Sequence, residues 1–562
     1  MMYDMIIVGS GNGACGFLSR YLEADSKTEK ILVIEEGQDF FDTSDITHQK
    51  SWSQSYLSEK IYKLHRAFTP QETPIVTGRA CTMGGGGSLN YTMIHESSQW
   101  LAKHLGRTES YWDNLKQKLN QKFERSDPTK NLSSATKHVL EKARAANFQL
   151  SSIPSTYNIP NHQEGDADLL HIFTTQFNQF GQRTNSGVSI VDWNDPRLEL
   201  KTHSRVVKLK FAEDEKPARC VGVNVKNLVT EEIQSFSLTA QGRLILCAGA
   251  ATPRLLMPHR EQLQNWEIGK HVNDHIAIPL GLYILDRQAI DATQKDNYLP
   301  VFATTVWKGQ QEEATCTFDF FAGDLPELLY FLPQLYFPFL VPNWLEKMAI
   351  AKPPLFYLIK NFIKELIRFI NLLINLWWSF TNLLKGKSWR HRDLPLITAV
   401  LKFSAAQEGY YLDDGQVRLK LFVENEETDF NQDKEAAKYA IEHHLAMINT
   451  LGKQPSWIFK FLLRAIAKIP YKEHQIDRYI DATSKYFLST EQHLAGGCIF
   501  DKAIDLGLDN PTNTGKLYGS VNIYVADLSA TPLPRISPQM TAYLIGFHVA
   551  KTLCSSNSQS SA

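Results

Sequence analysis

Two short apolar runs near the N-terminus flank a glycine-rich turn. The runs, residues 5–8 and 31–34, are continuously hydrophobic, as expected of parallel strands that are covered on both faces. Residues 14–22 between them have the spacing of a helix. The pattern therefore predicts strand, turn, helix and strand within about 35 residues, which is the size of a βαβ unit.

The rest of the chain alternates between irregular and patterned segments. Polar, irregular sequence fills residues 40–75, and helical spacing returns over 101–124. Strand-like stretches follow at 205–211, 220–225 and 244–247, with mixed strand and loop over 276–324. This mixture predicts an α/β fold, α+β overall.

Composition narrows the class of protein. The chain has 562 residues, of which 43% are hydrophobic and 21% are charged, so it can bury a large core. The formal net charge is −1, without the concentrated basic charge that nucleic-acid binding requires. The seven cysteines form no C-x-x-C pair, and the first strand follows no basic n-region or cleavage site, so we expect no secretory signal. We expect reduced thiols, no metal site and a cytoplasmic location.

The turn at residues 9–14 has the pattern of a dinucleotide-binding loop. Gly9 permits the tight turn, Gly11 lets the backbone approach a pyrophosphate, and the small Ala14 allows close packing of helix on strand. The pyrophosphate is expected at the N-terminus of the helix, beside Asn12 and Gly13, where N–H groups and the helix dipole favour an anion.

An acidic residue, Glu35, follows the second apolar run, 26 residues after Gly9. An acid in this place accepts hydrogen bonds from a ribose 2′-OH. The strand, the helix and the acid together make the glycine pattern a strong signal for a dinucleotide site, although they do not separate NAD from FAD.

Several further segments resemble the signatures of the glucose–methanol–choline (GMC) oxidoreductase family. Residues 84–90 resemble its glycine-serine loop, and residues 268–275 its mid-chain "G-x-x-x-x-D-H" element. The closing block of the family is matched in order and spacing, and in wording closest to the cholesterol-oxidase-like and long-chain-alcohol-oxidase branches, by residues 493–498, 515–519 and 522–532. Residues 100–124 resemble the early helix of the family, and residues 248–253 resemble its second signature.

The resemblance implies a fold and a domain plan. A Rossmann-type FAD-binding domain is expected over residues 1–275, with part of the substrate cap near 100–180. A discontinuous substrate-binding domain, built on an antiparallel sheet, is expected over 276–487. The chain then returns to the FAD domain over 488–562 with the catalytic histidine.

The resemblance also assigns cofactor contacts. The glycine loop is expected to let the backbone lie against the flavin ring, since glycine has no side chain there. Val206 matches the position whose backbone meets the adenine, and Asp527, with Leu528 behind it, a position near the ribityl chain and pyrophosphate. The loop residues assigned in this way are Gly84, Gly85, Gly86, Gly87, Ser88 and Asn90.

Two residues match the catalytic positions of the family. His493 matches the catalytic histidine, whose imidazole can take a hydroxyl proton near neutral pH while hydride passes to flavin N5. The second position is usually Asn or His before a proline, and here Ser537 precedes Pro538. Serine is a shorter donor and a poor base, so this departure leaves ordinary alcohol oxidation in question.

The leading expectation is an FAD-dependent oxidoreductase of a lipophilic alcohol, such as a sterol, long-chain alcohol or terpenoid, with an unknown electron acceptor. One alternative keeps FAD but changes the chemistry, for example to fatty-acid photodecarboxylation. Another is a membrane-associated flavoprotein subunit that has lost turnover.

Residues 325–386 differ sharply from the rest of the chain. They are rich in Leu, Phe, Ile and Trp, and Lys360, Lys364 and Arg368 form one basic stripe at a spacing of four. Glu35 and Asp527 lie on either side of this segment and must reach one FAD, so a single membrane span is excluded. An interfacial patch at the inner face of a membrane is favoured over burial against protein and over a two-span hairpin.

Overall fold

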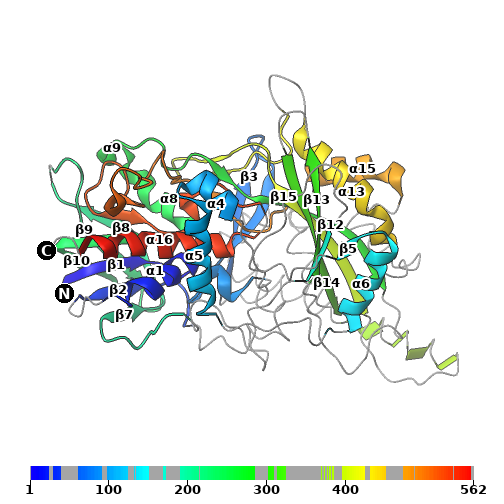
Figure 1. The fold of residues 1–562 in the computed structure, drawn as a ribbon, viewed down its shortest axis with the longest axis horizontal. Helices are drawn as coiled ribbons and strands as arrows, with labels where there is room; N and C mark the ends of the chain where they lie inside the picture. The colour runs from blue at the N-terminus through cyan, green and yellow to red at the C-terminus, as the bar shows by residue number, and fades with distance from the viewer. Residues whose placement is uncertain are drawn as a thin grey trace.

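The fold described below is that of a computed structural model of the chain. The structure describes residues 2–24, 29–39, 61–90, 98–123, 132, 134–150, 169–172, 190–213, 215–284, 301–308, 313–324, 395–424, 431–450, 472–486, 488–535 and 537–557, and single positions between 369 and 384. Two sheet-based bodies lie side by side, and both chain termini lie at the outer end of the first (Figure 1).

The first body is built on a seven-stranded sheet in the order β7-β2-β1-β10-β9-β8, with β19 also paired to β10. Its centre is parallel, whereas β8, β9 and the first half of β10 are antiparallel. The strands are β1 (Met2–Val8), β2 (Ile31–Ile34), β7 (Leu198–Lys201), β8 (Ser204–Phe211), β9 (Cys220–Asn227), β10 (Ile233–Leu246) and β19 (Ile523–Val525). The parallel centre, with the helix that follows β1, confirms the Rossmann-type fold expected from the apolar runs.

Helices α1 (Asn12–Tyr21) and α16 (Gln539–Asn557) run together along this sheet (Figure 1). They approach closely at glycines: a Cβ on Gly16 would lie 2.1 Å from the Tyr543 carbonyl oxygen, and a Cβ on Gly546 1.9 Å from the Gly13 oxygen. The C-terminal helix therefore fixes the helix that carries the glycine turn.

Further helices flank the first body. Helix spacing over 101–124 predicted one helix, but the structure has two, because Gly106 and Arg107 adopt positive φ angles of 66° and 69° and break it. The helices are α4 (Ser98–Leu105), α5 (Glu109–Asn120), α8 (Ala251–Leu256) and α9 (Arg260–Leu263), and the glycine loop contains the 3₁₀ turn η3 (Gly85–Ser88).

The second body is a six-stranded sheet, antiparallel except for its short edge pair β5 and β6. Its strands, in spatial order, are β12 (His275–Ile284), β15 (Pro395–Ser404), β14 (Glu313–Asp324), β13 (Val301–Lys308), β6 (Leu169–Ile172) and β5 (Gln149–Leu150). The antiparallel substrate-side sheet implied by the family resemblance is thus present.

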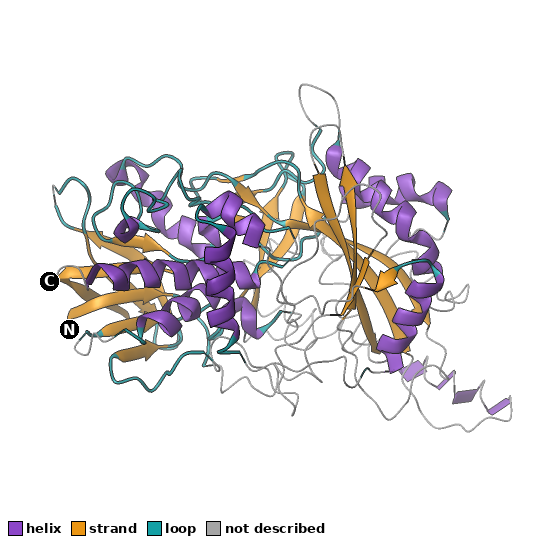
Figure 2. Ribbon diagram, in the orientation of Figure 1, coloured by secondary structure: helices purple, strands orange, loops and turns teal. Residues whose placement is uncertain are grey.

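Helices cover the outer face of this second sheet, away from the first body (Figures 1 and 2). They are α6 (Ser134–Ala145), α13 (Gln432–Thr450) and α15 (Ile476–Tyr486). On this face Phe318 stacks on His444 of α13 at 3.9 Å between ring centroids. His444 is therefore a core residue, and the adjacent His443 instead contacts Tyr439.

A small sheet completes the fold, in the order β16 (Tyr410–Tyr411), β17 (Val417–Arg418), β3 (Tyr62–Phe68) and β4 (Pro74–Ala80). The expectation of irregular structure over 40–75 is therefore wrong for β3 and the start of β4, while residues 40–60 lie outside the described residues. All seven cysteines are free thiols, as expected. In the described part of the chain, no helix combines the length and apolarity needed to cross a bilayer.

Candidate active site

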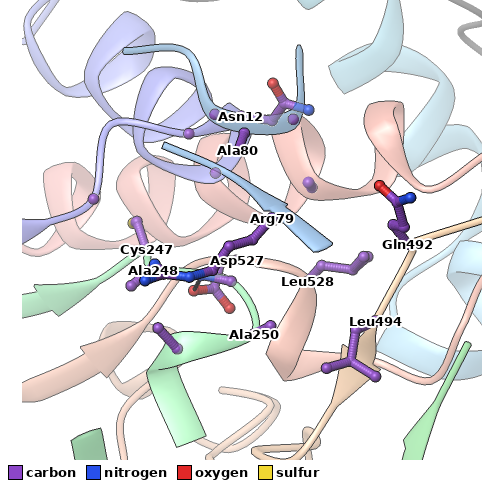
Figure 3. Close-up of a pocket in the computed structure, with 18 of the residues that line it drawn as sticks. Asn12, Arg79, Ala80, Cys247, Ala248, Ala250, Gln492, Leu494, Asp527 and Leu528 are labelled. Atoms are coloured by element: carbon purple, nitrogen blue, oxygen red, sulfur yellow. Dashed lines mark hydrogen bonds between the residues drawn. The ribbon is translucent and has the colours of Figure 1, made fainter. Parts of the chain in front are cut away.

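A cavity of about 490 Å³ runs between the two bodies, in the size range of ligand pockets. Its wall includes the glycine turn after β1, the glycine loop, residues 247–251 and the C-terminal segments around His493 and Asp527. In Figure 3, Cys247 and Ala248 lie at one side of the cavity and Gln492 and Leu494 at the other.

The two glycine segments meet across the cavity wall. A Cβ on Gly85 would lie 2.8 Å from the Gly11 Cα, so glycine is required for this approach. A Cβ on Gly11 would meet protein only at 3.8 Å or more, and one on Gly86 would meet nothing within 4 Å. Space beside both glycines therefore opens into the cavity, as a cradle for a ligand would require.

Glu35 reaches the cavity from the end of β2 and is buried. Its Oε2 accepts hydrogen bonds from Ser10 N at 3.0 Å and Ser10 Oγ at 2.7 Å, and its Oε1 accepts one from Gly37 N at 2.7 Å. Burial raises the pKa of this carboxyl, and the hydrogen bonds oppose the shift. Glu35 therefore ties the glycine turn to β2, and ribose binding by Glu35 stays a prediction.

Asp527 connects two segments of the cavity wall, residues 249–252 and its own turn at 527–529. Its Oδ2 accepts hydrogen bonds from Gly249 N at 2.7 Å and Thr252 Oγ1 at 2.6 Å. Its Oδ1 accepts hydrogen bonds from Ser529 N at 2.8 Å and Ser529 Oγ at 2.6 Å. The carboxylate thus orders the backbone that a cofactor would meet.

Most of the predicted cofactor residues line this cavity, but four do not. Ala14 is fully buried in the core, and Ser88 Oγ donates a hydrogen bond to the Met83 carbonyl at 2.7 Å. Gly84 N donates to the Ser10 carbonyl at 3.0 Å, and a Cβ on Gly87 would lie 2.3 Å from Asn12 Oδ1. These four shape the loops from behind the cavity wall. The residues brought to the wall are Gly9, Gly11, Asn12, Gly13, Glu35, Gly85, Gly86, Asn90, Val206, Asp527 and Leu528.

His493 lies in the cavity wall and contacts a second histidine. The Nδ1 atoms of His493 and His275 are 2.8 Å apart, with the rings near perpendicular at 84°. The fully buried Asp274 holds both residues, because its Oδ1 accepts hydrogen bonds from the backbone N–H groups of His275 and His493, each at 2.8 Å.

Backbone pairing brings these two segments together. The short strands β11 (Val272–Asn273) and β18 (Ala495–Gly496) are antiparallel partners just before His275 and just after His493. A Cβ on Gly496, whose φ is 84°, would lie 1.8 Å from the His271 oxygen. The mid-chain and closing motifs of the family therefore form one structural unit.

The environment keeps both imidazoles neutral. Burial lowers the pKa of His275 to about 3, and the Lys402 ammonium adds to the effect. Burial also lowers the pKa of His493 well below its usual range, with further contributions from His275 and Lys402. Burial raises the pKa of Asp274 to about 7, and its hydrogen bonds to the His493 and His275 N–H groups oppose that rise.

The sequence singled out His493 and Ser537, and both line the same cavity. The contact of His493 with His275 was not predicted from the sequence, although the "D-H" of the mid-chain element could have indicated it. Arg79 was not predicted either, although it lines the cavity and pairs with Glu36, at 2.6 Å between Nη1 and Oε2. No sequence pattern distinguished Arg79 from other arginines.

Comparison with known proteins agrees with this architecture. The family profile described as GMC oxidoreductase matches residues 3–277. An alcohol dehydrogenase [acceptor] of Pseudomonas putida is 29% identical over 320 residues, which cover 50% of this chain and 54% of that protein. The chain thus matches about half the length of that relative.

Solved structures share the whole fold at low identity. Formate oxidase from Aspergillus oryzae superposes with a TM-score of 0.65 at 15% identity, over 99% of each chain. Pyridoxine 4-oxidase from Mesorbium loti superposes with a TM-score of 0.62 at 15% identity, over 98% of each chain. With the glycine cradle and the paired motifs around His493, these matches lead to one conclusion: the chain belongs to the GMC oxidoreductase family.

Proposed function

We propose that this protein is an FAD-dependent oxidoreductase that oxidises the CH–OH group of an alcohol. The observation that carries the proposal is the meeting of His493 with the glycine cradle in one cavity. The cradle fits FAD because Gly11 and Gly86 leave room for a ligand and the first turn of α1 contributes to the same wall. The cofactor is FAD, and when bound it supplies the hydride acceptor.

The role of His493 is to take the hydroxyl proton of the substrate. For this its Nε2 must carry the lone pair, so its Nδ1–H donates to His275 Nδ1 across the 2.8 Å contact. His275 then carries its proton on Nε2, and the backbone carbonyls of Pro534 and Arg535 raise the pKa of this ring against the larger, opposite effect of burial. Asp274 fixes the backbones of His275 and His493 relative to each other through its two hydrogen bonds, and so supports this contact between the rings.

Reduction of the bound flavin by alcohols tests the proposal. We expect the purified holoprotein, without oxygen, to lose its oxidised-flavin absorbance on mixing with at least one member of a panel of sterols, long-chain alcohols and terpenoid alcohols. A protein that binds FAD but is bleached by none of them would contradict the proposed reaction and favour the loss-of-turnover alternative.

We further propose that the substrate is lipophilic and that the protein rests on a membrane surface. Support comes from the described positions between 369 and 384, where every large apolar side chain is 48–71% exposed. These residues recur at helical spacing, and short helical pieces appear at the outer edge of the second body (Figure 2). They are Phe369, Leu372, Leu373, Leu376, Trp377, Phe380, Leu383 and Leu384.

Charge next to this apolar face supports a lipid surface as its partner. Lys385, Lys387, Arg390 and Arg392 follow it directly in the sequence, where they would meet anionic head groups. An apolar face with basic flanks is typical of a helix that lies in the membrane interface. A cavity entrance at the membrane surface would admit a substrate that partitions into the bilayer.

Binding to liposomes tests this proposal. Full-length protein should co-sediment with anionic liposomes, and high salt should weaken the binding without abolishing it, because screening leaves the apolar contribution intact. Replacing Leu376, Trp377, Leu383 and Leu384 by serine should abolish co-sedimentation while the flavin is retained. Trp266→Ser is the matched control, since Trp266 is 61% exposed and lies outside this segment. If the full-length protein does not bind to liposomes, membrane association is refuted.

A further inference from the structure

The second sheet turns a polar face toward the cavity. Alternate residues along a strand share a face, and β14 and β15 pair with Thr317 opposite Lys402 and Asp319 opposite Val400. Asp319, Thr317 and Lys402 therefore lie on one face, and the apolar Phe318 lies on the other, against α13. Asp319 and Lys402 both line the cavity that contains His493.

A buried ion pair occupies this face. Lys402 Nζ contacts Asp319 Oδ2, and the two side chains are only 5% and 3% exposed. A buried pair of this kind is costly to desolvate and contributes little net stability. Its place in the wall of the cavity that also contains the proposed catalytic base favours a role in recognition.

A second carboxyl group stands beside the pair. Ala277 on β12 lies opposite Lys402 on β15. The backbone of residues 489–491 runs along the other side of β12. Two hydrogen bonds of 3.0 Å hold it there: Ala277 N donates to Ser489 O, and Glu491 N donates to His275 O. Glu491 also lines the cavity. Burial raises the pKa of Glu491, Lys402 opposes the rise and Asp319 adds to it.

One atom of this cluster has no hydrogen-bond partner among the residues that the structure describes. Asp319 Oδ1 is buried in the cavity wall, 2% of the residue is exposed, and no described residue makes a hydrogen bond to this oxygen. An unpaired buried carboxylate oxygen is costly, because it has lost its contact with water without gaining a hydrogen bond. A ligand group that donates a hydrogen bond would remove this cost.

We propose that Asp319 and Lys402 form a subsite for a second hydroxyl group of the substrate, near the hydroxyl that reacts. A neutral hydroxyl can donate to Asp319 Oδ1 and accept from the Lys402 ammonium at the same time. An ammonium group would be repelled by Lys402, and a carboxylate would face both Asp319 and Glu491. The inference rests on the proposed function: the substrate is a lipophilic alcohol with a second hydroxyl at its reacting end.

Matched ligands test the subsite. Hexane-1,2-diol and hexan-1-ol are titrated into the holoprotein without oxygen, and Kd is taken from the concentration dependence of the flavin spectral change or of its bleaching. The diol is expected to bind about 10–100-fold more tightly, the contribution of a hydrogen bond to a charged group. Asp319→Asn should reduce this preference to a few-fold or less.

Loss of one partner of a buried pair can also prevent folding, so the double variant Asp319→Leu/Lys402→Met is the second test. It removes both charges and should bind the two ligands equally, with its flavin retained. Asp195→Asn is the control, because Asp195 pairs with Arg197 outside the cavity, at 2.8 Å between Oδ2 and Nη2. This control should keep the wild-type preference.

The outcomes separate this inference from the proposed function. Equal Kd values for diol and alcohol in the wild-type protein, or binding of neither, would overturn the subsite. A preference for the diol that survives in both the single and the double variant would also overturn it. Tight diol binding without bleaching would support the subsite and count against alcohol oxidation.

Discussion

Replacing His493 by alanine is expected to slow alcohol-dependent reduction of the flavin by about 10²–10⁴-fold, the usual contribution of a general base. The flavin spectrum should be unchanged, because His493 meets Asp274 through its backbone N–H, which alanine retains. Stopped-flow absorbance of the holoprotein without oxygen measures the rate.

A matched control separates this effect from the loss of any buried imidazole. His444 is fully buried and stacks on Phe318, on the face of the sheet away from the cavity. His444→Phe should therefore retain the wild-type rate. An unchanged rate in His493→Ala would remove His493 from the mechanism.

The pH dependence of the same rate follows from the lowered pKa of His493. A group with a depressed pKa stays unprotonated as the pH falls through the ordinary histidine value of about 6.5. The base is therefore still available at about pH 6, and we expect no loss of rate near pH 6.5 from its protonation.

Replacing Gly11 by leucine is expected to remove nearly all bound FAD. The Cβ itself would fit, since its nearest protein atom is the Gly85 Cα at 3.8 Å, so the larger side chain must extend into the cavity. Absorbance of the purified protein, compared with its protein content, measures the loss.

The comparison with a smaller substitution makes this test specific. Gly11→Ala adds only a methyl group at ordinary contact distance and should retain most of the flavin. Gly13 would not serve, because a Cβ there would lie 2.1 Å from the Ala526 oxygen and disturb the fold itself. A fully yellow Gly11→Leu protein would refute the assigned pyrophosphate site.

The βαβ unit could be predicted because its determinants are local. Continuous apolar runs become β1 and β2, and the glycine turn between them opens α1. Features that depend on distant partners were not predictable in the same way. The strand β3 pairs with β4 and with β17, more than 300 residues away, and its own sequence is polar enough to resemble a loop.

The candidate active site shows the same limit. His493 and Ser537 were recognised by resemblance to a family motif, but the contact between His493 and His275 spans 218 residues. It exists because β11 pairs with β18, which the residues of either segment alone do not specify. The ion pair of Lys402 with Asp319 likewise depends on the register of β14 and β15.

Flavin reduction by a deuterated alcohol tests the central claim most directly. The holoprotein is mixed without oxygen with an alcohol that bleaches it, and then with the same alcohol carrying deuterium on the carbinol carbon. If His493 takes the hydroxyl proton while hydride leaves that carbon, bleaching is stoichiometric with bound FAD and several-fold slower for the deuterated alcohol. Flavin that no alcohol bleaches, or that is bleached at a rate insensitive to deuterium even when reduction is rate-limiting, would contradict the account.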